Sequence, residues 1–519
     1  MKMVKSLILG SAAGLVAMTG AQAADLPVKA KAVEYVRICS LYGAGFFYIP
    51  GTDTCIKLGG YLRVDTTFNA AGVQDQPAWN GDPGQGNRYR DYFSTRSRMA
   101  FTVDTRTATE YGVVRTFGQA DFQFDTLGGA TFNPNSLNTN LGNNANLLNS
   151  AGGGYTAVEF AFLQFAGFTF GKSASAYATP WHGYPGNNSS NLLGGHDTVT
   201  GVNNIQYTAQ FGNGVSGTIG IDDPTVFNRT AVYNLTTGIN ATGTTGNAYA
   251  GVHSPDVVGN IRIDQAWGLF QISAAAHEVD GSYNSLTAST AAPTNLSEIS
   301  GHPDTKWGGS VMAALNIKNI PTGPGDDIKI DASYAKGDTK NVISTSGASP
   351  SFAMFGGSGI GYQSVGFGAT TDAIYSPVAA GGDGSLHLTE AWGVRGAYNH
   401  NWDPYWSSSL FGSASWVRYD GTAKASYCAA YVAGNKLTAA NTSADFSCNP
   451  NFAVFQVGGI TRWTPVKNLT FSAEVMYTRL DQNFTGTAVL TPSAPKPAAV
   501  YQFKDQDTVT FNVRAQRNF

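Results

Sequence analysis

Arginine residues recur at alternating positions of three predicted β-strands in the first quarter of the chain: Arg63, Arg96, Arg98 and Arg115. Mostly apolar residues stand between them. Because successive side chains of a strand point to opposite faces, we expect the arginines to share one polar face. Fixed cations on a wetted wall attract anions and polar molecules from water, which is electrostatic chemistry and not bond breaking. The alternative is that each arginine pairs with a nearby acid and only keeps the wall hydrated.

A long polar segment, 173–202, contains a second group of side chains suited to contact a small molecule: Trp181, His182, Tyr184, His196 and Asp197. Aromatic rings offer flat apolar surfaces, and an exposed histidine changes charge near neutral pH. A histidine in such a segment is most simply only solvated. The alternative hypothesis is that His182 and His196 titrate between about pH 5 and 8 and give the protein a response to pH.

Sequence signatures of catalysis are missing from the chain. It has no G-x-S-x-G, H-E-x-x-H or G-x-x-x-x-G-K-[ST] motif, and no G-x-G-x-x-G that opens a helix. Its seven histidines are dispersed. We therefore expect neither an enzyme nor a cofactor, although spacing alone does not exclude a serine, histidine and acid set assembled by the fold.

The four cysteines lie in two local pairs, Cys39 with Cys55 and Cys428 with Cys448. An even number of cysteines in an exported chain favours disulfides, and four cysteines allow three connectivities. We predict the local pairing because each bond then closes a short loop. A metal site is not expected, because there is no C-x-x-C and no histidine at ligand spacing.

The elements that must position these residues are strands that alternate between apolar and polar side chains. Sixteen such strands are expected, joined alternately by tight turns and long polar loops. The last one ends at Phe519, which we expect to act as a C-terminal assembly signal. An even strand number with short turns at one end and long loops at the other is typical of a transmembrane antiparallel β-barrel, predicted here over 55–519.

Composition agrees with export to a membrane. Charged residues make up 13% of the chain, against roughly 25% in soluble domains, and after the leader no apolar run is long enough for a helical span. Lys2, Lys5 and the small residues around Ala23 predict a signal peptide at 1–23, followed by a periplasmic segment at 24–54. The expected location is the cell outer membrane. A net charge of −3 gives no reason to expect a nucleic acid partner.

Several segments resemble the general porins of alphaproteobacteria. They are Ala32–Cys39, Tyr42–Cys55, Phe165–Lys172, Pro255–Gly268 and Gln516–Phe519. The resemblance implies a sixteen-stranded barrel that forms a homotrimer and passes ions and small hydrophilic solutes by passive diffusion. From the expected location we also predict contact with outer-membrane lipid and lipopolysaccharide. It also implies that the third long loop, 173–202, folds into the lumen.

One feature departs from many porins of this kind, whose constriction loop carries several acids opposite an arginine cluster. Here the loop has only Asp197, so a strong field across the channel is not expected. Two alternatives remain open. One is a substrate-selective channel for a sugar or another nutrient, with Trp181, Tyr184 and Tyr61 at the start of an aromatic track. The other is a surface adhesin that forms no channel.

Overall fold

The computed structural model describes residues 37–71, 73–79, 84, 86–88, 92–125, 154–196, 199–226, 228–286, 295–343, 351–378, 381–493 and 496–519. The predicted signal peptide therefore lies outside the described residues. Among them, no helix has the length and apolar character needed to cross a membrane.

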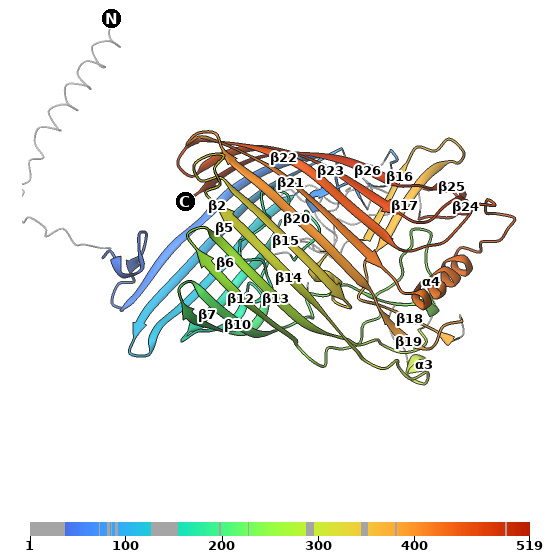
Figure 1. Cartoon of the computed structure of the whole chain (residues 1–519), viewed down its shortest axis with the longest axis horizontal. Coiled ribbons are helices and arrows are strands. Elements are labelled where there is room, and N and C mark those ends of the chain that lie inside the picture. Colours follow the sequence, from blue (N-terminus) through green and yellow to red (C-terminus); the bar gives the residue numbers. More distant parts are fainter. Residues whose placement is uncertain are drawn as a thin grey trace, which may run out of the picture.

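Sixteen long antiparallel strands form one closed barrel (Figure 1). They are β2 (Thr54–Phe68), β5 (Phe93–Thr109), β6 (Gly112–Asp125), β7 (Tyr155–Phe165), β8 (Phe168–Ser173), β9 (Val202–Gly212), β10 (Val215–Asp222), β12 (Asp256–Gln265), β13 (Gly268–Val279), β14 (Lys306–Lys318), β15 (Asp327–Lys336), β20 (Glu390–Asn401), β21 (Trp406–Arg418), β22 (Phe452–Val466), β23 (Leu469–Gln482) and β26 (Gln506–Asn518). Closure occurs between β2 and β26, where Tyr61 lies opposite Asn518. The predicted fold class and strand number are confirmed.

Tight turns connect the strands at one end of the barrel. Asn213 and Gly214, between β9 and β10, have φ values of 50° and 73°. These values are accessible to asparagine and glycine at little cost, which is why this dipeptide favours a hairpin. Trp267, Trp406 and Trp463 lie at other turns of the same end and are 50%, 43% and 41% exposed, as expected for an aromatic belt at a membrane surface.

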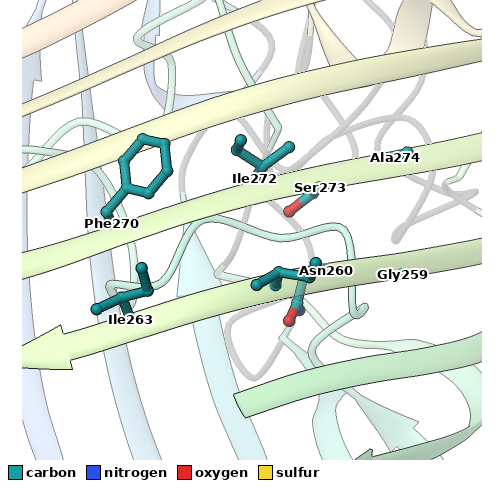
Figure 2. Close-up of a pocket in the computed structure, with 8 residues that line it drawn as sticks. Gly259, Asn260, Ile263, Phe270, Ile272, Ser273 and Ala274 are labelled. Atoms are coloured by element: carbon teal, nitrogen blue, oxygen red, sulfur yellow. The ribbon is translucent and has the colours of Figure 1, made fainter. Parts of the chain in front are cut away.

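The two faces of the barrel wall differ in polarity. On β2 the apolar residues Leu62 and Val64 point outward and are about half exposed, whereas Asp65 points inward and is buried. On β12 and β13 the outer face includes an apolar concavity of about 340 Å³ bordered by Ile263, Phe270 and others (Figure 2). Such an extensive apolar exterior is unfavourable in water and is stabilised when lipid covers it.

The long loops build a second layer at the opposite end of the barrel, which the sequence interpretation missed. Its elements are β11 (Val232–Asn234), β16 (Ser351–Gly356), β17 (Gln363–Ala369), β18 (Ala373–Ser376), β19 (Ser385–Leu388), β24 (Thr487–Leu490), β25 (Ala499–Phe503) and helix α4 (Gly421–Gly434). The expectation of plain polar loops is wrong here, because most of these segments share a hydrophobic core that includes Phe352, Phe367 and Tyr431, and β19 packs in a second cluster through Leu386. Figure 1 shows them gathered beyond one end of the barrel.

The remaining elements are short. They are β1 (Phe47–Tyr48), which pairs with β2, β3 (Ala70–Ala71), β4 (Val73–Pro77), α3 (Asn295–Glu298) and the 3₁₀ turns at Ser40–Tyr42, Leu235–Thr237 and Thr339–Asn341.

Both predicted disulfides are present. One joins Cys39 to Cys55 and ties the segment before the barrel to β2. The other joins Cys428 of α4 to Cys448 in the loop that leads to β22. The second bond therefore holds the helix against the chain that returns to the barrel wall.

Removing the second disulfide should loosen the loop layer without opening the barrel. The bonded cysteines are 20 residues apart, and closing a loop of that length contributes about 3 kcal/mol through the unfolded state. In Cys428→Ser/Cys448→Ser we expect trypsin to cut after Lys436 faster than in the wild type, while the barrel keeps its heat-modifiable migration in gels. An unchanged cleavage rate would show that the core alone holds the layer.

Candidate pore wall and constriction loop

Arg96 and Arg514 share one carboxylate on the inner face of the barrel. Asp65 of β2 is 1% exposed and lies opposite Arg96 of β5 and Arg514 of β26. The Arg96 Nη2 lies 2.8 Å from its Oδ2, and the Arg514 Nε donates to its Oδ1. One buried carboxylate therefore binds two buried guanidinium groups from neighbouring strands.

Arg98 and Arg63 face each other across β2 and β5 but differ in their partners. The Arg98 Nη1 lies 2.7 Å from Asp121 Oδ2 of β6 and 3.7 Å from Glu159 Oε1 of β7. The Arg63 guanidinium instead donates to Gln516 over 2.9 Å and lies 4.5 Å from the ring centre of Tyr61. Among the described residues, Arg63 forms no ion pair with a carboxylate.

Arg115 belongs to a separate cluster nearer the short turns. Its guanidinium donates to both oxygens of Asp104, which also pairs with Arg106. Its guanidinium carbon lies 5.3 Å from the ring centre of Phe117 and 5.5 Å from that of Phe162. Of the four predicted arginines, the structure thus brings three together and sets Arg115 apart.

These contacts also bear on the alternative in which each arginine is paired with an acid. Ion pairs hold Arg96, Arg98 and Arg115, as that alternative supposes. Around Asp65, the arginines Arg63, Arg96, Arg98 and Arg514 lie near the carboxylates of Asp121 and Glu159, and Asp125 of β6 lies opposite Arg96 in the strand register. A cationic surplus at this wall therefore stays a prediction.

The loop before β9 is bound to the polar face of several strands. Near its start, the side chains of Asn260 and Gln271 donate to the carbonyls of Ala176 and Ala178 over 2.6 and 2.7 Å. These donors lie on β12 and β13. The loop therefore leaves β8 and runs along a neighbouring part of the wall.

Farther along, the loop crosses to the strands near the closure of the barrel. The backbone N–H groups of Asn188 and Ser189 donate to Glu474 of β23 over 2.5 and 3.1 Å. Arg514 donates to the Asn188 carbonyl over 3.3 Å. This last bond links the loop to the arginines around Asp65.

A buried ion pair fixes the return of the loop. Arg395 of β20 is 1% exposed, and its Nε lies 3.0 Å from both oxygens of Asp331 on β15. The same guanidinium donates to the carbonyls of Leu192 and His196 over 3.3 and 2.5 Å. The Arg395 side chain therefore binds a buried carboxylate and two loop carbonyls. The sequence analysis did not predict that Arg395 holds the loop.

The predicted loop residues fall into different environments. Tyr184 is buried and donates to the Ser190 carbonyl, Trp181 packs beside Ala176 and Tyr177, and His182 lies 6.1 Å from the Phe160 ring on β7. Asp197 lies outside the described residues. Tyr184 and Trp181 belong to different hydrophobic clusters. The rings of Phe117, Phe160 and Phe162 form a further cluster that the sequence analysis did not predict.

His196 is enclosed at the junction of the loop with the wall. It is 5% exposed and its Nδ1 lies 2.7 Å from Asn341 Oδ1. Burial lowers the pKa of His196 to about 4, because a buried cation loses hydration. The ring therefore stays neutral between pH 5 and 8.

The pH dependence of stability follows from this lowered pKa. Above pH 6.5 the histidine is neutral in both states, but between 6.5 and 4 the unfolded chain takes up a proton that the folded chain does not. Acidification from pH 7 to 4.5 should therefore cost roughly 2–3 kcal/mol through this residue. His196→Gln should remove that part of the acid sensitivity in unfolding experiments, and the exposed His253→Gln should not. Equal acid sensitivity of His196→Gln and wild type would contradict the assignment.

Phe519 lies beside the closure strand. Its backbone N–H and carbonyl bond to Gly60 over 3.1 and 3.2 Å, and its side chain is 55% exposed. The part it plays in assembly remains a prediction.

A known protein family matches most of this chain. The chain matches the porin subfamily over residues 25–512. It is 35% identical over 270 residues to porin Omp2b of Brucella abortus (strain 2308), covering 51% of this chain and 63% of that protein, and 34% identical with the same coverage to Omp2b of Brucella suis biovar 1 (strain 1330). These matches span less than two thirds of the relatives' length.

A solved structure shares the fold. The outer membrane channel DcaP of Acinetobacter baumannii aligns with a TM-score of 0.55 and 15% identity, covering 91% of this chain and 99% of that one. Its likeness supports the closed barrel and carries no information on solutes. Because the family match extends over nearly the whole chain, this protein belongs to the porin subfamily and is an outer-membrane β-barrel, not an enzyme.

Proposed function

We propose that this protein forms a passive, water-filled diffusion channel for ions and small hydrophilic solutes. The observation that carries the proposal is the closed barrel with an apolar exterior and a polar interior, to which the segment 174–196 is bound along one side. Charged groups on such an interior replace part of the hydration of a passing ion and set its preference for cations or anions.

Within this proposal, the loop at about 173–202 narrows the lumen. Its hydrogen bonds include partners on β12, β13, β20, β22, β23 and β26. Near its end Thr200 donates to Glu159 of β7, whereas Arg63 and Arg98 lie on β2 and β5. The open passage then runs between the loop and these arginines, which together with Arg96 and Arg115 form the basic wall.

The proposal is tested by single-channel recording of the folded protein in a planar bilayer. We expect steps of current that rise linearly with voltage, and a reversal potential in a salt gradient that reports the net charge of the wall. A folded barrel that gives no current would refute a passive channel and favour a surface adhesin.

We also propose that three copies associate in the outer membrane, with lipid and lipopolysaccharide around them. Family membership supports this assembly. Mass determination of the detergent-solubilised protein by light scattering should give three chains for each particle, and current steps should come in threes. A single chain with full conductance would contradict the trimer.

A further inference from the structure

A cavity of about 450 Å³ lies on the inner face of the barrel between the constriction loop and the turn that joins β14 to β15. Strands β12 to β15 supply its wall, and Trp181 of the loop borders it together with Asn319 and Gly325 of the turn. Its volume falls within the range of sites that hold small molecules, roughly 300–1,000 Å³. None of the residues predicted for the basic wall takes part in it.

Three cations converge on this cavity. Arg262 of β12, Lys318 of β14 and Lys329 of β15 line it, and their side chains are 35%, 42% and 24% exposed. They therefore remain accessible to a solute. Two carboxylates, Asp264 and Asp327, line the same cavity, so one positive charge is left over.

The two acids also hold the cations in place. Asp264 lies 3.0 Å from the Arg262 Nη2 and 3.3 Å from the Lys318 Nζ. Asp327 lies 3.7 Å from the Lys329 Nζ, while it accepts hydrogen bonds from Asn316 and Asn399. The side-chain amides of Asn316 and Asn399 already donate to Asp327, and the Lys329 Nζ lies farther from this carboxylate. The Lys329 ammonium group can therefore donate hydrogen bonds to a solute.

Neutral groups suited to a hydroxylated ring complete the cavity. Trp181 and Asn316 border it, and their Nε1 and Oδ1 atoms are buried without a hydrogen-bond partner among the described residues. An aromatic side chain beside a polar amide and accessible cations matches a solute that has both a C–H surface and polar groups.

We propose that this cavity is a binding site for small hydroxylated solutes that carry one anionic group, such as sugar phosphates or sugar acids. The anion is held by Lys329 together with Lys318, and the ring of the solute lies against Trp181. This site rests on the proposed channel function. The channel would concentrate solutes of this class at the end of the barrel where the tight turns lie.

Calorimetric titration of the folded protein in detergent tests the site independently of conduction. Glucose 6-phosphate is the probe, with glucose and inorganic phosphate for comparison. We expect measurable binding of glucose 6-phosphate and at least tenfold weaker binding of the other two, because each lacks one of the two recognition elements. Lys318→Gln/Lys329→Gln and Trp181→Ala should each weaken binding about tenfold.

Lys336→Gln is the matched control. Lys336 lies on the same strand as Lys329 but points outward and pairs with Glu390, so its removal should leave binding unchanged. Absence of binding to the folded wild type, or equal binding in the cavity variants, would overturn the site even if the channel conducts. Binding by a barrel that carries no current would instead refute the channel and retain the site.

Discussion

Replacing Arg395 by glutamine is expected to destabilise the protein by about 3–5 kcal/mol and to raise its single-channel conductance. Arg395 and Asp331 are both almost fully buried and form an ion pair at 3.0 Å. Glutamine leaves the carboxylate buried without a countercharge, which is the costly way to break such a pair. It also withdraws the two donors that hold the carbonyls of Leu192 and His196.

The two effects can be separated by a second substitution. In Arg395→Gln/Asp331→Asn the uncompensated buried charge is gone, so much of the stability should return, while the loop still lacks its donors and the conductance should stay high. Heat-modifiable migration in gels measures the first effect and bilayer recording the second. Arg418→Gln, at the far end of β21, is the control.

Two results would contradict this account. Wild-type conductance in Arg395→Gln would mean that the other loop bonds suffice to keep the passage narrow. A double variant that regains both stability and wild-type conductance would mean that only the charge mattered.

The barrel could be predicted from the sequence because its signal is local. On β2, Leu62 and Val64 alternate with Arg63 and Asp65, and that alternation alone assigns each side chain to the lipid or the lumen. The same rule holds for the other strands, and the Asn213-Gly214 turn identifies a hairpin without any tertiary information.

The layer beyond the barrel could not be predicted in the same way. Its core joins residues far apart in the chain, for example Phe352 of β16, Ile374 of β18 and Ala488 of β24. These strands have only six, four and four residues, which is too short to show a clear period. One local signal was present, since Asp420 precedes an alanine-rich stretch and accepts a hydrogen bond from Ala423 at the start of α4, as N-cap residues do.

The pairing of side chains on neighbouring strands could not be predicted from the sequence, for another reason. Whether Arg96 faces Asp65 or a position two residues away depends on strand register, which no short segment specifies. The contacts that hold the loop against the wall could not be predicted either, because no short segment specifies them. Gly194 and Gly195 approach the wall so closely that a Cβ at Gly195 would collide with Asp331, yet in the sequence they are ordinary loop glycines.

Removing two arginines from the basic wall should shift the channel toward cations. In Arg63→Ala/Arg98→Ala, two positive charges are lost while the nearby carboxylates Asp65, Asp121, Asp125 and Glu159 remain, so the local charge becomes more negative. Each charge removed at the edge of a watery passage changes the free energy of a nearby ion by about 0.6 kcal/mol before screening. We expect the ratio of cation to anion permeability to rise about two- to fivefold.

Reversal potential in a salt gradient measures this ratio directly. Of the two residues, Arg63 should contribute more to selectivity at little structural cost, because its partners are Gln516 and the Tyr61 ring and not a buried acid. Removal of Arg98 leaves Asp121 buried and unpaired, so the single variants should also differ in stability. Arg479→Ala is the control. Arg479 forms an exposed ion pair with Asp481 and Asp505, so this substitution removes one positive charge away from the passage and should leave the reversal potential unchanged. If the double variant kept the wild-type reversal potential at low salt, where screening is weakest, the arginines would serve only to neutralise their acids and another part of the lumen would set the ion preference.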